Sequence, residues 1–587
     1  MPDSAGAETA LGDSRRSLAP RWRALILGFS HAILMALAFE PALWFIAFIA
    51  PLPLFMLALY PNGSPKRVGM WAAIGVIPLW VYTHAWIGSV SAAGLYPLVL
   101  YMSVYTWLMV VVGHQASRSR LPAAASLVLV WCGLEFFRAQ IAWAGYPWYM
   151  LGHPMIESPA SILAWPAAIG GVPLVSALVA CPAAWWVTRR VSSRRIQLAV
   201  SAAMLIWVLS GMLRQNIAQP SPSDPFRVGV VQTNIPQDNR MDWTTAQRLV
   251  DWQEMRDLTV DIARSSDGVD LIVWPEGLVP GWTFDPVALK HERDRGIVWR
   301  VNPSSEEQAK LLAGYGPRVP ATRVVDEILA MQRVLDIPML VGAAAYDNLR
   351  IVSSERGGIE YENDAMYNSA FLVQNGQVGD VWYDKLHLTP FGEVMPYISA
   401  IPWLEDRLLS IGAEGMAFAL SPGRSAKTIT VPSGQRSVEL ATPICFEATM
   451  PSVCRRLANI AHATGHPVVL VNISNDGWFG SSDRGRSMHK LGARWRCVEL
   501  GLPMVRSANT GISSSISAQG QVLDTIPPRE AGSSAFEVQP GISRTIYSRV
   551  GEWFGWAAML GLVPMIWFGK GRNSHQPAMP ADSNTRS

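Results

Sequence analysis

The sequence predicts a multi-pass α-helical membrane domain joined to a layered α/β domain. Of the 587 residues, 50% are hydrophobic and only 16% are charged, whereas a soluble enzyme carries roughly 25% charged residues. The apolar residues gather toward the N-terminus, while residues 220–550 alternate short apolar strands with amphipathic helices. The 25 Trp agree with this division, because Trp collects at the interface between membrane and water.

Seven apolar segments precede residue 220 and an eighth lies near the C-terminus, each close to the ~20 residues that cross a bilayer. They lie near 24–39, 41–60, 68–88, 94–113, 121–137, 162–188, 196–213 and 553–569. The first is the weakest, because it is short and contains His31. The sixth contains Gly170, Gly171 and Pro173, so we expect it to be broken or partly re-entrant.

Lys and Arg occur in alternate connecting loops, with Arg138 as the main exception. They precede the first segment and follow the second, fourth, sixth and eighth, at Arg15, Arg16, Arg21, Arg23, Lys66, Arg67, Arg118, Arg120, Arg189, Arg190, Arg194, Arg195, Lys570 and Arg572. Because loops rich in Lys and Arg stay in the cytoplasm, both termini are predicted to be cytoplasmic and residues 220–550 external. The predicted parts are a tail (1–21), a membrane domain (22–215), an α/β domain (220–550), a last membrane helix (551–570) and a tail (571–587).

Composition also excludes several functions. A net charge of +3 is too small to suggest a nucleic-acid partner. The five cysteines are odd in number and scattered, so they predict neither a disulfide framework nor a zinc site. His/Cys metal clusters and Gly-rich phosphate loops are absent from the sequence, and no metal is predicted.

The α/β domain is predicted from alternating strand and helix patterns. The predicted strands are 227–233, 269–275, 338–345, 368–374, 378–383, 437–445, 467–473, 503–508 and 512–518, and the predicted helices are 244–264, 321–335, 452–463 and 487–500. Residues 281–320 are polar and irregular. We expect them to form a surface insertion, with a lid over the site as the less favoured alternative.

Three short motifs lie at or just beyond predicted strand ends, where α/β domains build their sites. VWPEG presents Glu276, YDKLHLTPFGE presents Lys385 and Glu393, and TPICFE presents Cys445 and Glu447. Each motif alone would be weak, because a Cys ending a strand is usually core and a Glu after a strand is usually a surface residue.

The residue types fit nucleophilic catalysis. A thiol attacks a carbonyl as thiolate, so Cys445 needs a base or a positive environment. Glu276 is the predicted base, with its pKa raised toward neutrality in a partly desolvated site. Lys385 and the backbone N–H after Cys445 are predicted to stabilise the oxyanion. Glu393 is predicted to orient Lys385 or Glu276, although a simple salt bridge to Lys385 is nearly as plausible.

The Glu, Lys and Cys appear in the order found in the nitrilase (carbon–nitrogen hydrolase) superfamily, which the chain resembles. Residues 367–369 (YNS) and 475–479 (NDGWF) also match that superfamily. The resemblance implies an αββα sandwich for the α/β domain. A nitrilase-like domain inserted between membrane segments resembles the arrangement of the apolipoprotein N-acyltransferase family. This resemblance covers nearly the whole chain.

Two motifs of the membrane part, LEFFR at 134–138 and GYPW at 145–148, look like signatures of that family. Glu135 and Arg138 could form a stabilising i,i+3 pair near a helix end. As ionisable residues close to lipid, they are also functional candidates.

The resemblance implies a multi-pass protein of the bacterial cytoplasmic (inner) membrane with its catalytic domain on the periplasmic face. It implies that Cys445 takes a fatty acyl group from a phospholipid, typically phosphatidylethanolamine, as a thioester. The acyl group then passes to the α-amine of diacylglyceryl-cysteine in an apolipoprotein. No cofactor is required.

The family's residues carry over to this chain position by position. Glu276, Lys385 and Cys445 match the triad, and Glu393 and Glu447 match its supporting acids. Trp243 matches a Trp near the mouth of the site, with ordinary packing as its other interpretation, and Trp478 has the same two interpretations with packing favoured. The chain departs from the family at Phe446, where the family has Tyr, and in its longer segment between Glu276 and Lys385.

Two other functions remain open at this point. A membrane-tethered amidase would use the same triad to hydrolyse a carbon–nitrogen bond, with water as the second nucleophile. An inert membrane scaffold is the third candidate. The intact Glu, Lys and Cys argue against the scaffold.

Overall fold

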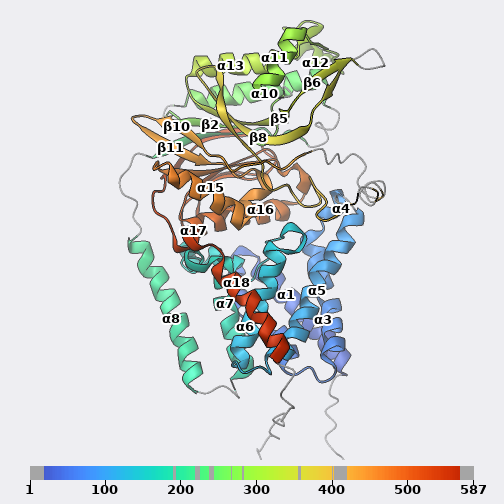
Figure 1. The fold of residues 1–587 in the computed structure, drawn as a ribbon, viewed down its shortest axis with the longest axis vertical. Helices are drawn as coiled ribbons and strands as arrows, with labels where there is room; N and C mark the ends of the chain where they lie inside the picture. Colours follow the sequence, from blue (N-terminus) through green and yellow to red (C-terminus); the bar gives the residue numbers. More distant parts are fainter. Residues whose placement is uncertain are drawn as a thin grey trace, which may run out of the picture.

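The computed structural model describes residues 19–90, 92–189, 194–217, 225–236, 243–265, 268–280, 283–353, 359–398, 401, 403, 407 and 420–568. Figure 1 shows two parts, a bundle of helices and an α/β domain that lies on one end of it. Residues 1–18 and 571–587, nearly all of the two predicted tails, lie outside the described residues.

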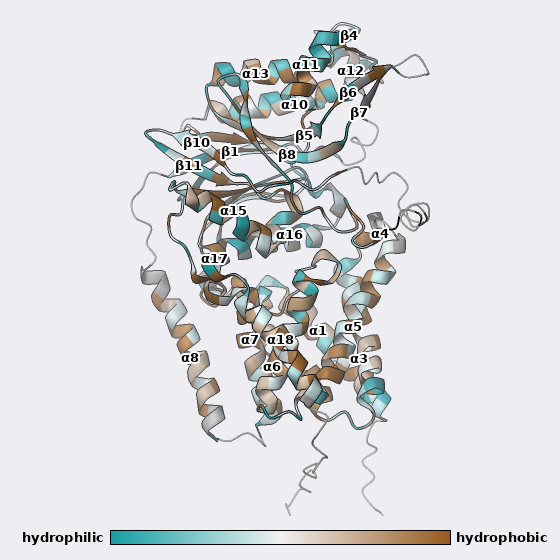
Figure 2. Cartoon of the chain, viewed as in Figure 1, coloured by the Kyte–Doolittle hydropathy of each residue, from teal (hydrophilic) through white to brown (hydrophobic). Residues whose placement is uncertain are grey.

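The predicted apolar segments lie on mainly helical structure. The long helices are α1 (Pro20–Ala38), α3 (Pro65–His84), α5 (Ala92–Ala116), α6 (Ala123–Gln140), α7 (Ala167–Thr188), α8 (Arg194–Ile217) and α18 (Trp553–Phe568). Shorter helices are η1 (Pro41–Phe48), α2 (Leu52–Leu59), α4 (Ile87–Val90), η2 (Ala142–Ala144), η3 (His153–Glu157) and η4 (Pro159–Ser161). Four stretches are long and apolar enough to cross a membrane: Pro20–Ala38, Pro41–Leu59, Gly94–Ala116 and Ala167–Thr188. Figure 2 shows the hydrophobic character of the bundle.

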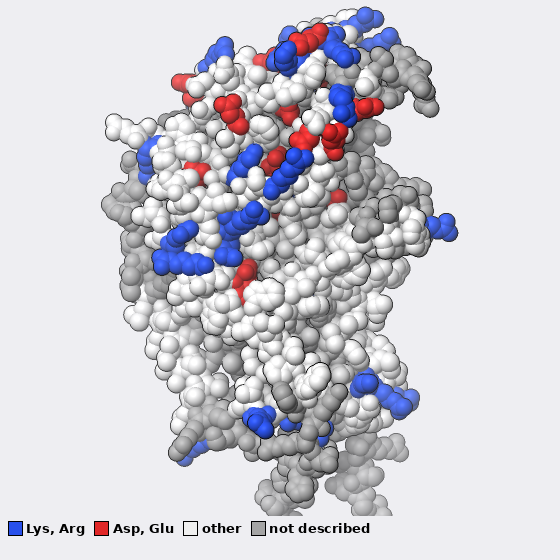
Figure 3. Space-filling view, viewed as in Figure 1, with Lys and Arg blue, Asp and Glu red and all other residues white. Residues whose placement is uncertain are grey.

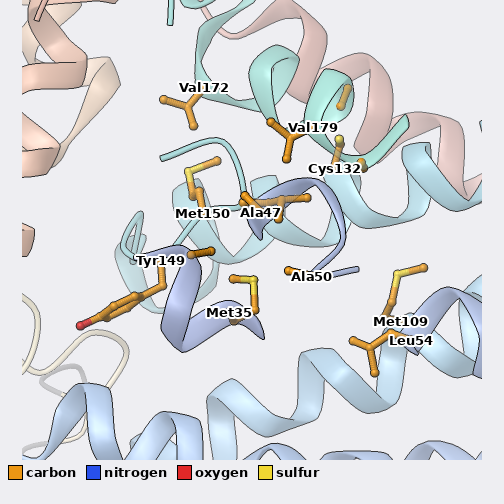
Figure 4. Packing of buried hydrophobic residues seen from close by; sticks show 14 of the residues in the cluster. Met35, Ala47, Ala50, Leu54, Met109, Cys132, Tyr149, Met150, Val172 and Val179 are labelled. Carbon is orange, nitrogen blue, oxygen red and sulfur yellow. The ribbon is translucent and has the colours of Figure 1, made fainter. Parts of the chain in front are cut away.

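The bundle packs through small and flexible side chains. A side chain at Gly28 would lie 2.4 Å from the carbonyl of Ala72, and one at Gly75 would lie 2.5 Å from the carbonyl of Leu25. Small residues at such contacts let helices α1 and α3 approach closely, as in other membrane bundles. Figure 4 shows the interior, where Met35, Ala47, Ala50, Leu54, Met109, Cys132, Tyr149, Met150, Val172 and Val179 are labelled.

The predicted break in the sixth segment is confirmed. Gly170 (φ −133°) and Gly171 (φ +74°) are not helical inside α7. The break frees the backbone N–H of Val172, which donates to Glu499 Oε1 at 3.1 Å. The interruption thus ties the bundle to helix α16 (Asp483–Leu500) of the α/β domain.

The basic loops meet at the end of the bundle that faces away from the α/β domain. Arg23 at the start of α1 donates to the carbonyl of Tyr60 at 2.7 Å. His114 near the end of α5 contacts the carbonyl of Ala58 at 2.9 Å, and Gln115 donates to the carbonyl of Ile566 at 2.6 Å. Figure 3 shows Lys and Arg at the lower end of the bundle, below a surface with few charges.

The α/β domain contains two six-stranded sheets with the orders β16-β1-β2-β5-β8-β9 and β10-β11-β12-β13-β14-β15. The first comprises β1 (Phe226–Gln232), β2 (Leu271–Val273), β5 (Met339–Asp347), β8 (Ala365–Gln374), β9 (Gln377–Asp384) and β16 (Gly532–Val538). The second comprises β10 (Ile429–Ser433), β11 (Arg436–Ala441), β12 (Val468–Ser474), β13 (Met504–Ala508), β14 (Ser513–Ile516) and β15 (Val522–Ile526).

Helices cover the outer face of each sheet. Helices α10 (Thr245–Ala263) and α13 (Arg323–Leu335) lie over the first sheet, and α15 (Pro451–Ala463) and α16 lie over the second, with the two sheets face to face (Figure 1). Strand residues alternate between the two cores: Val228 and Val230 pack between the sheets, whereas Val231 packs under α10. The predicted αββα sandwich is confirmed.

The prediction that residues 281–320 are irregular was wrong. They contain α11 (Pro286–Arg295), β3 (Val298–Arg300), α12 (Glu306–Leu311) and β4 (Arg318–Pro320). Asp285 caps α11 by accepting the N–H groups of Val287 and Ala288 at 2.8 and 3.1 Å, and Ser305 caps α12. Local capping therefore orders a polar segment that lacks a long apolar face.

Candidate active site

Three turns at strand ends bring the predicted residues to one place. Glu276 lies just beyond β2, Lys385 follows β9 directly, and Cys445 lies beyond β11 of the other sheet. Because the two sheets face each other, the ends of strands from both sheets meet at the same edge of the sandwich. All three side chains are buried, with exposures of 5%, 0% and 8% respectively.

The Glu276 carboxylate is held from two sides. Its Oε1 accepts the side-chain amide of Asn368 at 2.6 Å and lies 3.4 Å from Lys385 Nζ. Its Oε2 accepts the backbone N–H of Asn475 at 2.8 Å. These contacts hold the carboxylate in place, and none of them comes from a second carboxylic acid. The YNS and NDGWF motifs each supply one of its partners.

Lys385 is more tightly bound to Glu393 than to Glu276. Its Nζ lies 2.9 and 2.8 Å from the two carboxylate oxygens of Glu393. Burial alone would lower the pKa of Lys385, but the charges of Glu393 and Glu276 outweigh burial and raise that pKa. Lys385 is therefore a cation at neutral pH. Among the described contacts, Glu393 does not touch Glu276, and Lys385 contacts both acids.

Cys445 sits in a sharp turn with φ +53°, a left-handed conformation that is rare for a residue with a side chain. The predicted strand 437–445 therefore ends early, at Ala441, and Cys445 opens the 3₁₀ turn η5 (Cys445–Thr449). Burial raises the pKa of the Cys445 thiol, the Glu276 charge raises it further, and Lys385 opposes both. The resting thiol is therefore protonated, and its ionisation requires a base.

Glu447 joins the two turns that present Lys385 and Cys445. Its carboxylate accepts backbone N–H groups of Ile444, Leu386 and His387 at 2.8, 2.7 and 2.9 Å. The hydroxyl of Tyr383 donates to the same carboxylate at 2.9 Å. Glu447 is fully buried, so it acts on the site by holding backbone rather than by touching a substrate.

The predicted aromatic residues lie in different places. Phe446 is 7% exposed, packs against the ring of His387 with centroids 6.1 Å apart, and belongs to the hydrophobic cluster of the bundle. Trp478 is half-buried in the 3₁₀ turn η6 (Asp476–Phe479). Trp243 is also half-buried, and its indole donates to Asp251 of α10 at 2.6 Å. Among the described contacts, Trp243 touches no triad residue, so its place at the mouth stays a prediction.

Glu135 and Arg138 bind a loop rather than each other. Glu135 Oε1 accepts the N–H of Leu151 at 2.6 Å. Arg138 Nη1 donates to the carbonyls of Tyr146 and Trp148 at 3.0 and 2.7 Å. The pair therefore fixes the GYPW loop on α6, and among the described contacts Glu135 and Arg138 form no i,i+3 ion pair.

Sequence reasoning missed a buried polar network beside Cys445. Asp476 accepts from Arg506 at 2.7 Å and lies 2.9 Å from His489 Nδ1, and all three side chains are at most 2% exposed. Arg506 lies within the fully buried strand β13 (Met504–Ala508). A charged residue in such a strand needs a buried partner. The position of Arg506 was therefore the sequence signal that could have revealed this network.

Within the residues that the structure describes, no group of three or more His, Cys, Asp or Glu could hold a metal ion. The described cysteines are all unpaired.

The fold and the site define a carbon–nitrogen hydrolase domain on a membrane-embedded helical domain. Residues 227–547 match the family model "Carbon-nitrogen hydrolase", and the chain belongs to this family. Residues 31–185 match the model "Apolipoprotein N-acyltransferase N-terminal domain".

Curated relatives cover almost the whole chain. The apolipoprotein N-acyltransferase of Geobacter metallireducens is 26% identical over 579 residues, 94% of this chain and 96% of that protein. The corresponding protein of Vibrio vulnificus is 25% identical over 560 residues, 92% of this chain and 96% of that protein. Among solved structures, an amidase from Nesterenkonia sp. is 16% identical with a TM-score of 0.33, over 56% of this chain and 95% of that chain. The predicted resemblance to apolipoprotein N-acyltransferases is confirmed, and the chain is an acyltransferase with membrane helices.

Proposed function

We propose that this chain transfers a fatty acyl group from a membrane phospholipid to the N-terminal amine of diacylglyceryl-cysteine in bacterial apolipoproteins. The observation that carries the proposal is the buried cluster of Glu276, Lys385 and Cys445. It belongs to the α/β domain, which lies on the end of the bundle opposite the basic loops (Figures 1 and 3). The curated relatives, which share both parts of the chain, support the class of reaction.

In the first step, the Cys445 thiol attacks the ester carbonyl of the phospholipid. Glu276 takes the thiol proton as the carbon–sulfur bond forms, which the protonated resting thiol requires. Lys385 and the backbone N–H of Phe446 stabilise the oxyanion. The carbon–oxygen bond then breaks, Glu276 returns the proton to the leaving alkoxide, and a lysophospholipid departs. The acyl group remains as a thioester on Cys445.

In the second step, the uncharged α-amine of the apolipoprotein attacks the thioester. Glu276 accepts a proton from the amine as the carbon–nitrogen bond forms. The carbon–sulfur bond breaks, and the proton held by Glu276 goes back to Cys445. The products are an N-acylated lipoprotein and the free enzyme, so no cofactor is consumed. Phosphatidylethanolamine is the proposed donor, on the family resemblance alone.

The proposed location is the bacterial inner membrane. Residues 22–215 and 551–570 are assigned to the membrane, 220–550 to the periplasmic face, and 1–21 and 571–587 to the cytoplasm. The clustering of the basic loops at the end away from the α/β domain supports this orientation.

The purified protein tests the proposal when it is incubated with phosphatidylethanolamine vesicles and a diacylglyceryl-cysteine peptide. We expect the mass of the peptide to rise by one acyl group in the presence of the wild type and to stay constant with Cys445→Ala. Cys454→Ala is the matched control, because Cys454 is buried nearby but its sulfur contacts the Glu447 carbonyl. Release of free fatty acid without N-acyl peptide would instead indicate a hydrolase.

A further inference from the structure

The mechanism above leaves a charged network unused, directly behind the nucleophile. Asp476 accepts from Arg506 Nη2 at 2.7 Å and from Ser474 Oγ at 2.8 Å, and its carboxylate lies 2.9 Å from His489 Nδ1. Burial alone would raise the pKa of Asp476, but Arg506 and His489 hold it far below its ordinary value. Asp476 is therefore a fixed anion in the interior of the domain.

His489 links this network to the backbone of Cys445. Its Nε2 lies 3.1 Å from the Cys445 carbonyl oxygen. A carbonyl only accepts hydrogen bonds, so Nε2 must carry a proton and donate. On the other side of the ring, Nδ1 faces Asp476 at 2.9 Å and Arg506 at 3.1 Å. The ion pair of Asp476 with Arg506 thus fixes the orientation of the imidazole.

The Cys445 carbonyl belongs to the same peptide unit as the N–H of Phe446. A trans peptide is planar, so its C=O and N–H point in opposite directions. A donor that holds the carbonyl therefore also sets where the Phe446 N–H points. Asn472 Nδ2, at 3.4 Å from the same oxygen, is a longer second contact.

One aromatic ring from each domain packs against the imidazole of His489. The Trp148 ring lies 6.3 Å from the His489 ring at 33°, and the Phe479 ring lies 5.8 Å away at 67°. Trp148 is only 3% exposed and is anchored through its carbonyl by Arg138 of α6. Its ring and that of Phe479 exclude water, which would otherwise compete for the Cys445 carbonyl.

We infer that His489 is a positioning residue: its Nε2–H holds the Cys445 carbonyl so that the Phe446 N–H points at the oxyanion, with Asp476 and Arg506 fixing the ring. This inference rests on the proposed role of Cys445 as nucleophile. It assigns His489 no contact with substrate. Replacement of His489 must therefore change the rate of acylation rather than lipid binding.

The test measures the rate and the lipid dependence of thioester formation by intact mass in wild type, His489→Leu and His489→Gln. We expect His489→Leu to slow acylation at saturating lipid by about 100-fold, the scale of a small misplacement of reacting groups, with little change in KM. His489→Gln should recover part of the rate, because its amide N–H can replace Nε2–H. His153→Gln is the matched control, since His153 is also buried at this interface but packs on Trp495, and it should keep the wild-type rate.

A double-mutant cycle provides the second measurement. Asp476→Asn should slow acylation, and Asp476→Asn combined with His489→Leu should be no slower than His489→Leu alone, because both act through one hydrogen bond. If His489→Leu does not fold, His489→Gln and Asp476→Asn carry the test, and normal acylation in both would overturn the inference. A wild-type rate in folded His489→Leu, or a loss confined to KM, would also overturn it. Absence of a Cys445 thioester in the wild type would instead overturn the proposed function.

Discussion

Lys385 Nζ lies 3.4 Å from Glu276 Oε1 but 2.8 Å from Glu393 Oε2, so the lysine is paired first with the acid that is not the proposed base. Glu393 thus gives the Lys385 cation an anionic partner other than the proposed base. The second acid therefore allows a buried cation and a working base to share one site. This arrangement separates the roles proposed for Glu276 and Lys385.

Replacement of Lys385 by Met should slow thioester formation by about 3 kcal/mol of barrier, the scale of losing one oxyanion donor. Lysophospholipid release in a single turnover measures this rate. Lys490→Met is the matched control, because Lys490 is a half-buried lysine on the neighbouring helix α16. Equal rates in wild type and Lys385→Met would mean that other donors stabilise the oxyanion.

The ion pair of Glu393 with Lys385 should make stability depend on pH. Burial alone would raise the pKa of Glu393, but Lys385 holds it below the ordinary carboxyl value. Because the folded pKa is lower than the unfolded pKa, this stabilisation is fully present above the ordinary value of about 4.3 and is lost as pH falls through the lowered one.

Thermal unfolding of the detergent-solubilised protein between about pH 3 and 7 checks this prediction. Glu393→Gln should lower the Tm at neutral pH and reduce the fall of the Tm in acid. Glu439→Gln, which changes a buried glutamate that accepts Thr430 Oγ1 at 2.7 Å, should keep the acid dependence of the wild type. The same slope in Glu393→Gln and wild type would show that this pair does not set the acid limit.

Phe446 should control whether water reaches the thioester. Its buried ring lies next to Cys445 and in contact with the cluster of the bundle, so it excludes water until the amine arrives. Phe446→Ala should raise the ratio of free fatty acid to N-acyl peptide in a single turnover. Phe446→Tyr keeps the ring and should leave the ratio nearly unchanged. Mainly free fatty acid from the wild type at saturating acceptor would contradict the transferase proposal.

The orientation in the membrane is testable with single cysteines at exposed positions. Ser64 lies in the basic loop before α3 and Ala309 lies on α12. In intact cells, an impermeant thiol reagent should label Ala309→Cys and spare Ser64→Cys, and both should react after the membrane is permeabilised. The reverse pattern would place the catalytic domain in the cytoplasm.

The alternating strands and helices predicted a layered α/β domain, because they are local signals, and the resemblance carried by the short motifs implied the αββα sandwich and the triad. It did not predict β16, in which only Phe536 and Val538 are buried, because that edge strand is defined by its pairing with β1. It named Glu447 only as a supporting acid and did not predict its contacts, because three of its four hydrogen-bond donors, Tyr383, Leu386 and His387, are 60 to 64 residues away in the sequence. The contact of Trp148 with His489 depends on the packing of the two domains, which no local pattern encodes.

The most direct test of the account is the mass of the protein after exposure to phosphatidylethanolamine without acceptor. We expect wild type to gain one acyl group on Cys445, to lose it to neutral hydroxylamine and to pass it to a diacylglyceryl-cysteine peptide. Glu276→Gln should remain unacylated, because the buried thiol keeps its proton, and Cys445→Ala should gain no mass. An acyl group that persists in Cys445→Ala, or one that Glu276→Gln acquires at the wild-type rate, would contradict the account.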